Sequence, residues 1–148
     1  MATVKRFEEL EVRQDARQLV QAIYLASRQR AVYRDSGLRE QIRRASISIL
    51  SNIAEGFERG TKRDFVHFLN IAKASSGEVR AQLYAALDQH YLSQQEFLAI
   101  RESLLTLSRK LASFIGYLER NAGAGRTNRS TRRAVFEPAT CNLQPAAL

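Results

Sequence analysis

The sequence predicts an all-α protein folded as an up-down-up-down four-helix bundle. Only two prolines and seven glycines interrupt its 148 residues, which leaves room for long helices. Apolar residues recur at three- and four-residue spacing in four stretches, and no strand-like alternation competes with that period. Because only a few residues connect the four stretches, successive helices are expected to lie antiparallel, as in such a bundle.

The first helix is expected over about residues 7–32 and the second over about 38–59. Asp35 and Ser36 precede the second helix and offer N-cap side chains, and Gly60 is expected to end it. In each helix one face repeats apolar or small residues at the spacing of a buried stripe. These predicted core residues are Val12, Ala16, Leu19, Val20, Ile23 and Ser27 in the first helix, and Ile42, Ala45, Ile49, Ile53 and Gly56 in the second.

The third helix is expected over about residues 61–90 and the fourth over about 93–121. Thr61 with Asp64 resembles a capping box with Asp in place of Glu, and the fourth helix opens with a cleaner S-x-x-E start. Both helices again carry one apolar stripe. The predicted core residues are Phe65, Phe68, Leu69, Ala72, Val79, Leu83, Ala86 and Leu87 in the third helix, and Phe97, Ile100, Leu104, Leu107, Leu111, Phe114 and Leu118 in the fourth.

Two regions of different composition divide the chain. Residues 1–121 form the predicted bundle domain, and residues 122–148 form a basic tail without helical periodicity. The tail holds four arginines, two glycines and two prolines, a composition that favours disorder. Packing of the tail through Val135, Phe136 and Leu143 is the alternative.

The charge of the chain points to its partners. Lys and Arg number 23 against 15 Asp and Glu, which gives a formal net charge of +8 and a pI near 10.2. Nucleic acid is the usual polyanionic partner of a basic protein of this kind. The sequence shows no membrane-spanning apolar run and no secretory leader, so a cytoplasmic protein without a membrane partner is expected. Cys141 is the one cysteine and cannot form an internal disulfide.

The second helix carries more apolar surface than one bundle core can cover. A second apolar line runs beside its core stripe, and a line of small residues on the third helix would let another helix come close. Each helix of a four-helix bundle has one inward face, so either the tail or another copy must cover the second line. We expect a homo-oligomer. Its predicted interface residues are Ile47, Leu50, Ala54 and Phe57 on the second helix, and Asn70, Ala74, Gly77 and Ala81 on the third.

Several blocks of the sequence resemble a bacterial four-helix bundle family named after the intervening sequences of 23S ribosomal RNA. The most specific blocks are QIRRA at residues 41–45 and SNIAEG at residues 51–56. Phe7-Glu8-Glu9-Leu10 and Phe65-x-x-Phe68-Leu69 match the family pattern as well. The resemblance covers about residues 7–120 and leaves the arginines of the tail outside.

The resemblance implies a homo-oligomer, expected to be a ring of five bundles, with no known catalytic activity. The accessory variability proteins of diversity-generating retroelements are distantly similar in fold and form basic pentamers that bind nucleic acid. The sequence departs from the family pattern at three positions. Arg13 stands where the family usually has Trp, Leu50 where it has Pro, and Arg80 where it has an acidic residue. Two of these departures raise the positive charge.

No pattern in the sequence points to catalysis, a cofactor or a metal. A carboxylate-bridged di-metal bundle needs two Glu-x-x-His pairs and further carboxylates, whereas this chain has one approximate case, Asp64-x-x-His67. Asp64 is better explained as a cap, and His90 lies about six helical turns from His67, too far to share a site. Neither a G-x-x-x-x-G-K phosphate loop nor a plausible Ser, His and acid set is found. We therefore expect a non-enzymatic protein without a cofactor.

The basic residues are the remaining candidates for function. Two arginines follow a glutamate at the spacing of a favourable ion pair and are interpreted as solvated, paired side chains: Arg44 after Glu40, and Arg59 after Glu55. The others favour phosphate binding to RNA or DNA without marked sequence selectivity, and a ring would repeat each patch along a polyanion. The predicted nucleic-acid contacts are Arg39, Arg43, Lys62, Arg63, Arg126, Arg129, Arg132 and Arg133.

A second hypothesis belongs to another class of protein. In it, the oligomer is a scaffold that docks an unidentified protein partner through its helix faces, and the charge serves only solubility. The two hypotheses separate on salt, because phosphate binding weakens steeply as salt rises and apolar docking does not.

Overall fold

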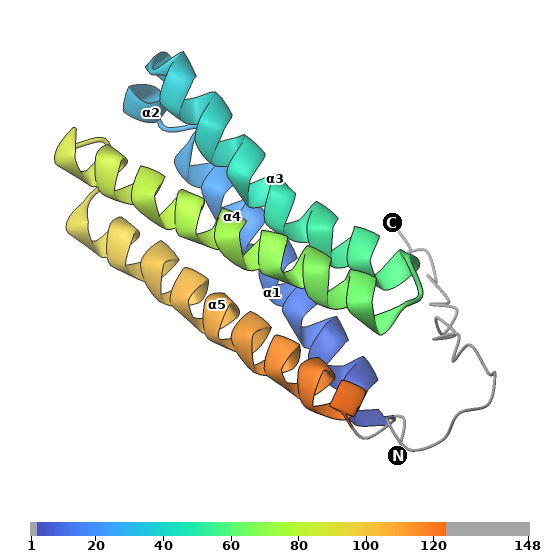
Figure 1. Cartoon of the computed structure of the whole chain (residues 1–148). Helices are drawn as coiled ribbons and strands as arrows, with labels where there is room; N and C mark the ends of the chain where they lie inside the picture. The colour runs from blue at the N-terminus through green and yellow to red at the C-terminus, as the bar shows by residue number, and fades with distance from the viewer. Residues whose placement is uncertain (1–2, 124–148) are drawn as a thin grey trace, which may run out of the picture.

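Long antiparallel α-helices account for nearly all of the described chain. The computed structural model describes the backbone of residues 3–123 and the side chains of residues 11–121. Over that range the chain forms helices and no strand: α1 Thr3–Ala26, α2 Arg30–Arg34, α3 Ser36–Glu58, α4 Lys62–Asp88 and α5 Gln94–Gly123. Figure 1 shows the four long helices as one bundle, with the short α2 at one end. The predicted all-α helical bundle is confirmed.

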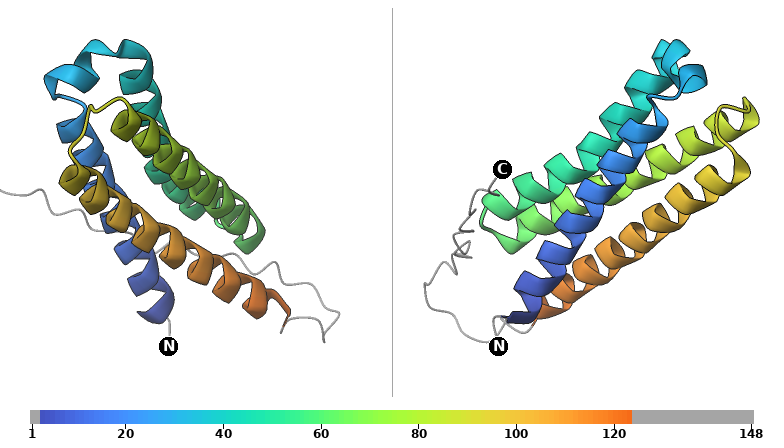
Figure 2. Two further views of the ribbon diagram at one scale, coloured as in Figure 1. Left: turned by 90° about the vertical axis from the view of Figure 1, so that its left-hand side faces the viewer. Right: turned by 180° about the vertical axis from the view of Figure 1, so that it is seen from behind.

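The four long helices surround the core in the order α1, α3, α4, α5. α3 packs against α1 and α4, and α5 packs against α4 and α1 (Figure 2). The bundle thus has two ends with different surfaces. We call the end that carries α2 and the α4–α5 connection the α2 end, and the end that carries the turn between α3 and α4 the Gly60 end. α5 runs to Gly123, so the bundle continues slightly past the predicted boundary at residue 121.

The first predicted helix is two helices in the structure, which corrects the expected span of residues 7–32. α1 ends at Ala26, and α2 begins at Arg30 after a turn. The turn is built on Ser27, whose hydroxyl donates to the carbonyl of Tyr24 at 3.0 Å and accepts from Arg43 Nε at 2.7 Å. The change of direction lets Val32 cover the end of the core, where it is 3% exposed. A straight helix would have carried that side chain past the bundle.

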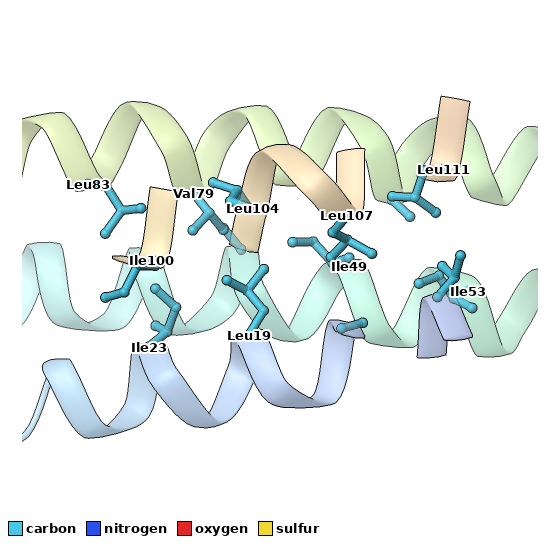
Figure 3. Packing of buried hydrophobic residues seen from close by; sticks show 14 of the residues in the cluster. Leu19, Ile23, Ile49, Ile53, Val79, Leu83, Ile100, Leu104, Leu107 and Leu111 are labelled. Atoms are coloured by element: carbon cyan, nitrogen blue, oxygen red, sulfur yellow. The ribbon is translucent and has the colours of Figure 1, made fainter. Parts of the chain in front are cut away.

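The core lies where the sequence predicts it. In Figure 3 Leu19 and Ile23 of α1 point toward Ile49 of α3, and side chains of α4 and α5 fill the space above them. Burying one such side chain contributes about 1.5–3 kcal/mol, so the interlocking stripes are the main source of stability. Of the predicted core residues, all are buried except three at its edge, which are half-buried: Val20, Phe68 and Leu87. Buried apolar side chains that the stripes did not include are Val32, Phe57, Leu92 and Ile115.

Small polar side chains lie in the seam between α3 and α4. The hydroxyls of Ser48 and Ser75 form a 2.9 Å hydrogen bond across the two helices, and Asn52 Nδ2 donates to the Ser48 carbonyl at 2.8 Å. Farther along this seam, Gly56 lets the backbones of α3 and α4 approach closely, because a Cβ there would lie 2.8 Å from Phe68 Cβ. Small polar side chains and one glycine therefore allow α3 and α4 to run side by side (Figure 1).

Three predicted helix starts are confirmed by their hydrogen bonds, whereas α1 begins at Thr3, before the predicted residue 7. Asp35 caps α3 by accepting from the Leu38 amide at 3.0 Å, and Thr61 caps α4 by accepting from the Asp64 amide at 3.1 Å. α5 opens with the full reciprocal box expected from S-x-x-E. The α3–α4 turn also follows the prediction, since Gly60 adopts a φ of 72°, which favours glycine.

Candidate nucleic-acid interface

Arginines gather where α1 ends, α2 crosses the bundle and α3 begins. We call this segment, residues 28–44, the α2 corner. It holds six arginines and two carboxylates, Asp35 and Glu40. Asp35 is engaged in the fold, because it caps α3 and accepts a 3.2 Å hydrogen bond from the Tyr91 hydroxyl. Partial burial, together with this carboxylate, raises the pKa of Tyr91. The six arginines are Arg28, Arg30, Arg34, Arg39, Arg43 and Arg44.

Arg39, one of the predicted contacts, links α3 to α2. Its guanidinium lies 4.5 Å from the centre of the Tyr33 ring, and its Nη1 donates to the Tyr33 carbonyl at 2.6 Å. The Tyr33 side chain lies on the surface, with 56% of the residue exposed. Since a guanidinium has five N–H donors, the single bond to Tyr33 leaves Arg39 able to meet a phosphate as well.

Arg43 is also held in place by the fold. Its guanidinium stacks on Tyr24 of α1 at 4.6 Å, and its Nε donates to the buried hydroxyl of Ser27. Beside it, a shallow hollow between α1 and α3 is lined by Tyr24, Glu40, Arg43, Arg44 and Ile47. The structure therefore gives Arg39 and Arg43 a structural role in addition to the predicted one.

A second basic group lies at the Gly60 end. Lys62 is half-buried and Arg63 is exposed. Arg59 forms the predicted pair with Glu55 at 2.8 Å. Phe65, in the first turn of α4, contacts Phe114 of α5 with ring centroids 5.2 Å apart. The first turn of α4 thus lies beside the last turns of α5, and the chain leaves the bundle at this end.

The two predicted basic groups do not form one site. Arg39 and Arg43 lie in the first half of α3, toward the α2 end, whereas Lys62 and Arg63 open α4 at the Gly60 end. From Arg43 to the end of α3 at Glu58 the helix rises by about 22 Å. The remaining predicted contacts, Arg126, Arg129, Arg132 and Arg133, lie outside the described residues.

One of the predicted interface residues of α3, Leu50, borders a groove between α1 and α3. Ile47 is 40% exposed, and Leu50 and Ala54 are half-buried. Leu50 lines the groove together with residues of α1 that include Arg17 and Val20. Phe57 is a correction to the prediction: it is 8% exposed and packs edge-to-face on Phe65 at 6.3 Å. Close approach of α3 and α4 at Gly56 brings these two rings together, so Phe57 belongs to the core.

The predicted interface residues of α4 lie on another side of the molecule. Asn70, Ala74 and Ala81 are exposed, and Gly77 borders a groove between α4 and α5. Exposed apolar side chains that the sequence reasoning missed lie near the α2 end of the helices. They are Leu25 at 56%, Tyr84 at 44% and Leu98 at 45% exposure.

The comparisons with known proteins agree with this fold. The sequence profile of the family described as 23S rRNA-intervening sequence protein matches residues 8–113. The chain belongs to this family. A crystal structure of a protein of unknown function from the S23 ribosomal protein family, from Bacteroides thetaiotaomicron VPI-5482, superimposes with a TM-score of 0.68 at 22% identity. The match covers 74% of this chain and 98% of that one, and at this identity it bears on the fold alone. No curated protein matches the sequence.

Family membership divides the candidate contacts into two sets. The α2 corner, Lys62 and Arg63 fall within the matched residues, and the arginines of the tail follow them. Sequence reasoning missed three arginines of the α2 corner, Arg28, Arg30 and Arg34, together with Tyr33, and it interpreted Arg44 as paired with Glu40. The signal was the run Arg28-Gln-Arg-Ala-Val-Tyr-Arg34, which has five polar side chains in seven residues. A continuous helix would have spread these side chains around its circumference, and the turn at Ser27 gathers them at one corner instead.

The described residues offer little to metal or acid–base chemistry. No group of three or more His, Cys, Asp or Glu that could hold a metal is found among them. Asp64 is engaged with Thr61 at the start of α4, and His67 is exposed beside Phe68. In the same part of the chain, no helix is long and apolar enough to cross a membrane.

Proposed function

We propose that this chain forms a non-enzymatic homo-oligomer that binds RNA or DNA through phosphate contacts, with little sequence selectivity. The observation that carries the proposal is the α2 corner, where six arginines face two carboxylates and one of these, Asp35, is used as a helix cap. Phosphate contacts fix a protein on nucleic acid without reading the bases. The corner therefore has the charge and the donors for a polyanion, and it lacks the dense pairing that would neutralise them.

The Gly60 end supplies a second contact region in this proposal. Lys62 and Arg63 lie where α5 ends, and the residues that follow Gly123 carry four arginines and one glutamate. These residues contribute +3 of the formal +8 charge. A nucleic acid that reaches both ends of a bundle would follow its long axis.

Oligomerisation would multiply these weak contacts. A ring of five subunits is the expectation from the family resemblance, and the surface supports an assembly of that kind. The α1–α3 groove lined by Leu50 and the α4–α5 groove bordered by Gly77 lie on different sides of the bundle. Contact between two different faces is heterologous and can close into a ring. Repeated patches then bind one polyanion with a higher effective concentration.

The binding proposal is tested by fluorescence anisotropy with labelled single-stranded RNA and duplex DNA in a salt series. We expect affinity to fall by roughly two orders of magnitude between about 50 and 200 mM salt. The double variant Lys62→Glu/Arg63→Glu should weaken binding and flatten the salt slope. Arg101→Glu/Arg109→Glu on α5 makes the same charge change elsewhere and is the matched control. Absence of binding at low salt would reject the proposal.

One observation favours the scaffold alternative. Tyr84 and Leu98 are large apolar side chains that are nearly half exposed on α4 and α5, and Tyr84 contacts Phe97 at 4.9 Å. A protein partner could cover this surface at the α2 end. In that case binding would be insensitive to salt and would be lost in the variant Leu98→Glu.

A further inference from the structure

Two tyrosines near the α2 end, Tyr24 of α1 and Tyr33 of α2, each have an arginine stacked on the ring. Arg39 stacks on Tyr33 at 4.5 Å, and Arg43 stacks on Tyr24 at 4.6 Å. Residues four apart lie on one face of a helix, so the two stacks occupy successive turns of α3. These two stacked Arg–Tyr pairs, which we call the ladder, lie on a surface that is rich in arginine.

Tyr33 is the member of this ladder that a ligand can reach. It is 56% exposed, whereas Tyr24 is half-buried in the hollow beside Arg44. The core at this end is closed by Val32, the neighbouring residue, which is 3% exposed. Burial in the core therefore does not account for the Tyr33 ring, and the ring is displayed next to exposed guanidinium groups.

The ladder is fixed before any ligand arrives. Arg39 is bonded to the Tyr33 carbonyl, and Arg43 is bonded to Ser27, the residue on which the α1–α2 turn is built. α2 is therefore held against α3 from both sides of the turn. Because the position of the Tyr33 side chain is already fixed, it loses little conformational entropy when a ligand stacks on its ring.

We propose that the α2 corner is a binding site for single-stranded nucleic acid, in which a nucleobase stacks on Tyr33 and the surrounding arginines contact the flanking phosphates. Bases stack on aromatic rings and on guanidinium planes without strong sequence preference, because every base has a π-face. In a duplex the bases are already stacked on one another, so only a single strand can use Tyr33. The inference rests on the proposed function and adds to it a preference for single strands.

The test compares base-containing and base-free ligands of equal charge. Anisotropy is measured with labelled single-stranded RNA, single-stranded DNA, a duplex, and an abasic strand of the same length. The variants are Tyr33→Leu, which removes the aromatic ring, and Tyr33→Phe, which keeps it. Tyr84→Leu is the matched control, because Tyr84 is 44% exposed on α4 and has no stacked arginine among the described residues. Circular dichroism and thermal unfolding establish that each variant is folded.

We expect wild-type protein to bind the base-containing single strands at least about fivefold more tightly than the abasic strand. Tyr33→Leu should abolish that difference and leave duplex and abasic binding unchanged, while Tyr33→Phe and Tyr84→Leu should behave as wild type. Stronger binding of RNA than of DNA would show that the sugar is also contacted. Equal binding of abasic and base-containing strands, or a Tyr33→Leu variant that binds as wild type, would overturn the stacking site and leave phosphate binding intact. Failure of every ligand to bind at low salt would reject both proposals.

Discussion

The side-chain amide of Gln29 donates a 2.6 Å hydrogen bond to Glu96, across 67 residues of sequence. Glu96 also caps α5, since its other carboxylate oxygen accepts from the Ser93 amide at 2.9 Å. One carboxylate thus starts a helix and ties it to the turn between α1 and α2. Asp35 acts in the same way, because it caps α3 and accepts from the Tyr91 hydroxyl. The α2 end is held together by two capping carboxylates that also bridge its connections.

Acid should weaken this junction. The backbone hydrogen bond from Ser93, with further bonds from Gln29 and the Ser93 hydroxyl, lowers the pKa of Glu96. Its contribution to stability is therefore complete above the usual pKa of 4.5 and is lost as the pH falls through the lower folded value. Because Glu96 is partly exposed, we expect Glu96→Gln to cost about 0.5–1 kcal/mol at neutral pH and less at pH about 3. Urea unfolding of both proteins at the two pH values, at one protein concentration, measures this. An equal difference at both pH values would contradict it.

Lys110 should stabilise the bundle at neutral pH, and its contribution should be lost at high pH, whereas that of Glu96 is lost at low pH. It bridges α5 to α1 by bonds to Asp15 at 2.7 Å and to Glu11, and these bonds raise the pKa of Lys110 above its usual value of 10.5. The contribution is complete below that value and is lost as the pH rises through the folded pKa. Since the groups are partly exposed, Lys110→Met should cost about 0.5–1 kcal/mol at neutral pH. Arg109→Met, the exposed neighbour, should cost less. Chemical denaturation measures the loss of unfolding free energy in each of the two variants.

Two glycines in α-helices should respond to alanine in opposite directions. A Cβ on Gly56 would lie 2.8 Å from Phe68 Cβ and 2.9 Å from Phe65 Cδ2, so Gly56→Ala must force α3 and α4 apart and should cost about 1–3 kcal/mol. Gly77 has no atom within 4 Å of the position of an added Cβ. Gly77→Ala should therefore stabilise by about 0.5–1 kcal/mol through helix propensity. Thermal unfolding at one concentration gives both values, and a stable Gly56→Ala variant would refute the close-packing argument.

The proposed oligomer should depend on the exposed apolar line of α3. Ile47 is 40% exposed beside half-buried Leu50. Ile47→Glu would place a charge in a buried interface and should convert the oligomer to monomers at micromolar concentration, which light scattering measures. Thr106→Glu, at an exposed position of α5, is the control and should leave the mass unchanged. A monomeric wild-type protein would remove the oligomer from the proposal.

The candidate site was less predictable from the sequence than the core. Arg39 and Arg43 were identified by their charge, but their partners come from residues that precede them by 6 and 16 positions. Tyr33 was missed because it lies just past the end of the helix predicted over residues 7–32, and its contact with Arg39 arises only when α2 meets α3. Phe57 was assigned to the surface by its position on the helical wheel, and the structure buries it because Gly56 brings α4 close. Contacts of this kind depend on how two elements meet, and helical periodicity carries no information about that.

The sequence by itself determined the four apolar stripes, the caps at Asp35, Thr61 and Ser93, the Gly60 turn and the family of the chain. These features follow from local backbone preference and from the spacing of apolar residues, which each segment carries on its own. Only the tertiary structure decided the break after Ala26 and the shape of the α2 corner, where Arg39 stacks on Tyr33. The break is fixed by Ser27, which is 1% exposed and bonded to Arg43 of another helix. Such a bond forms only when distant segments have packed together, so the shape of this corner is a property of the assembled bundle.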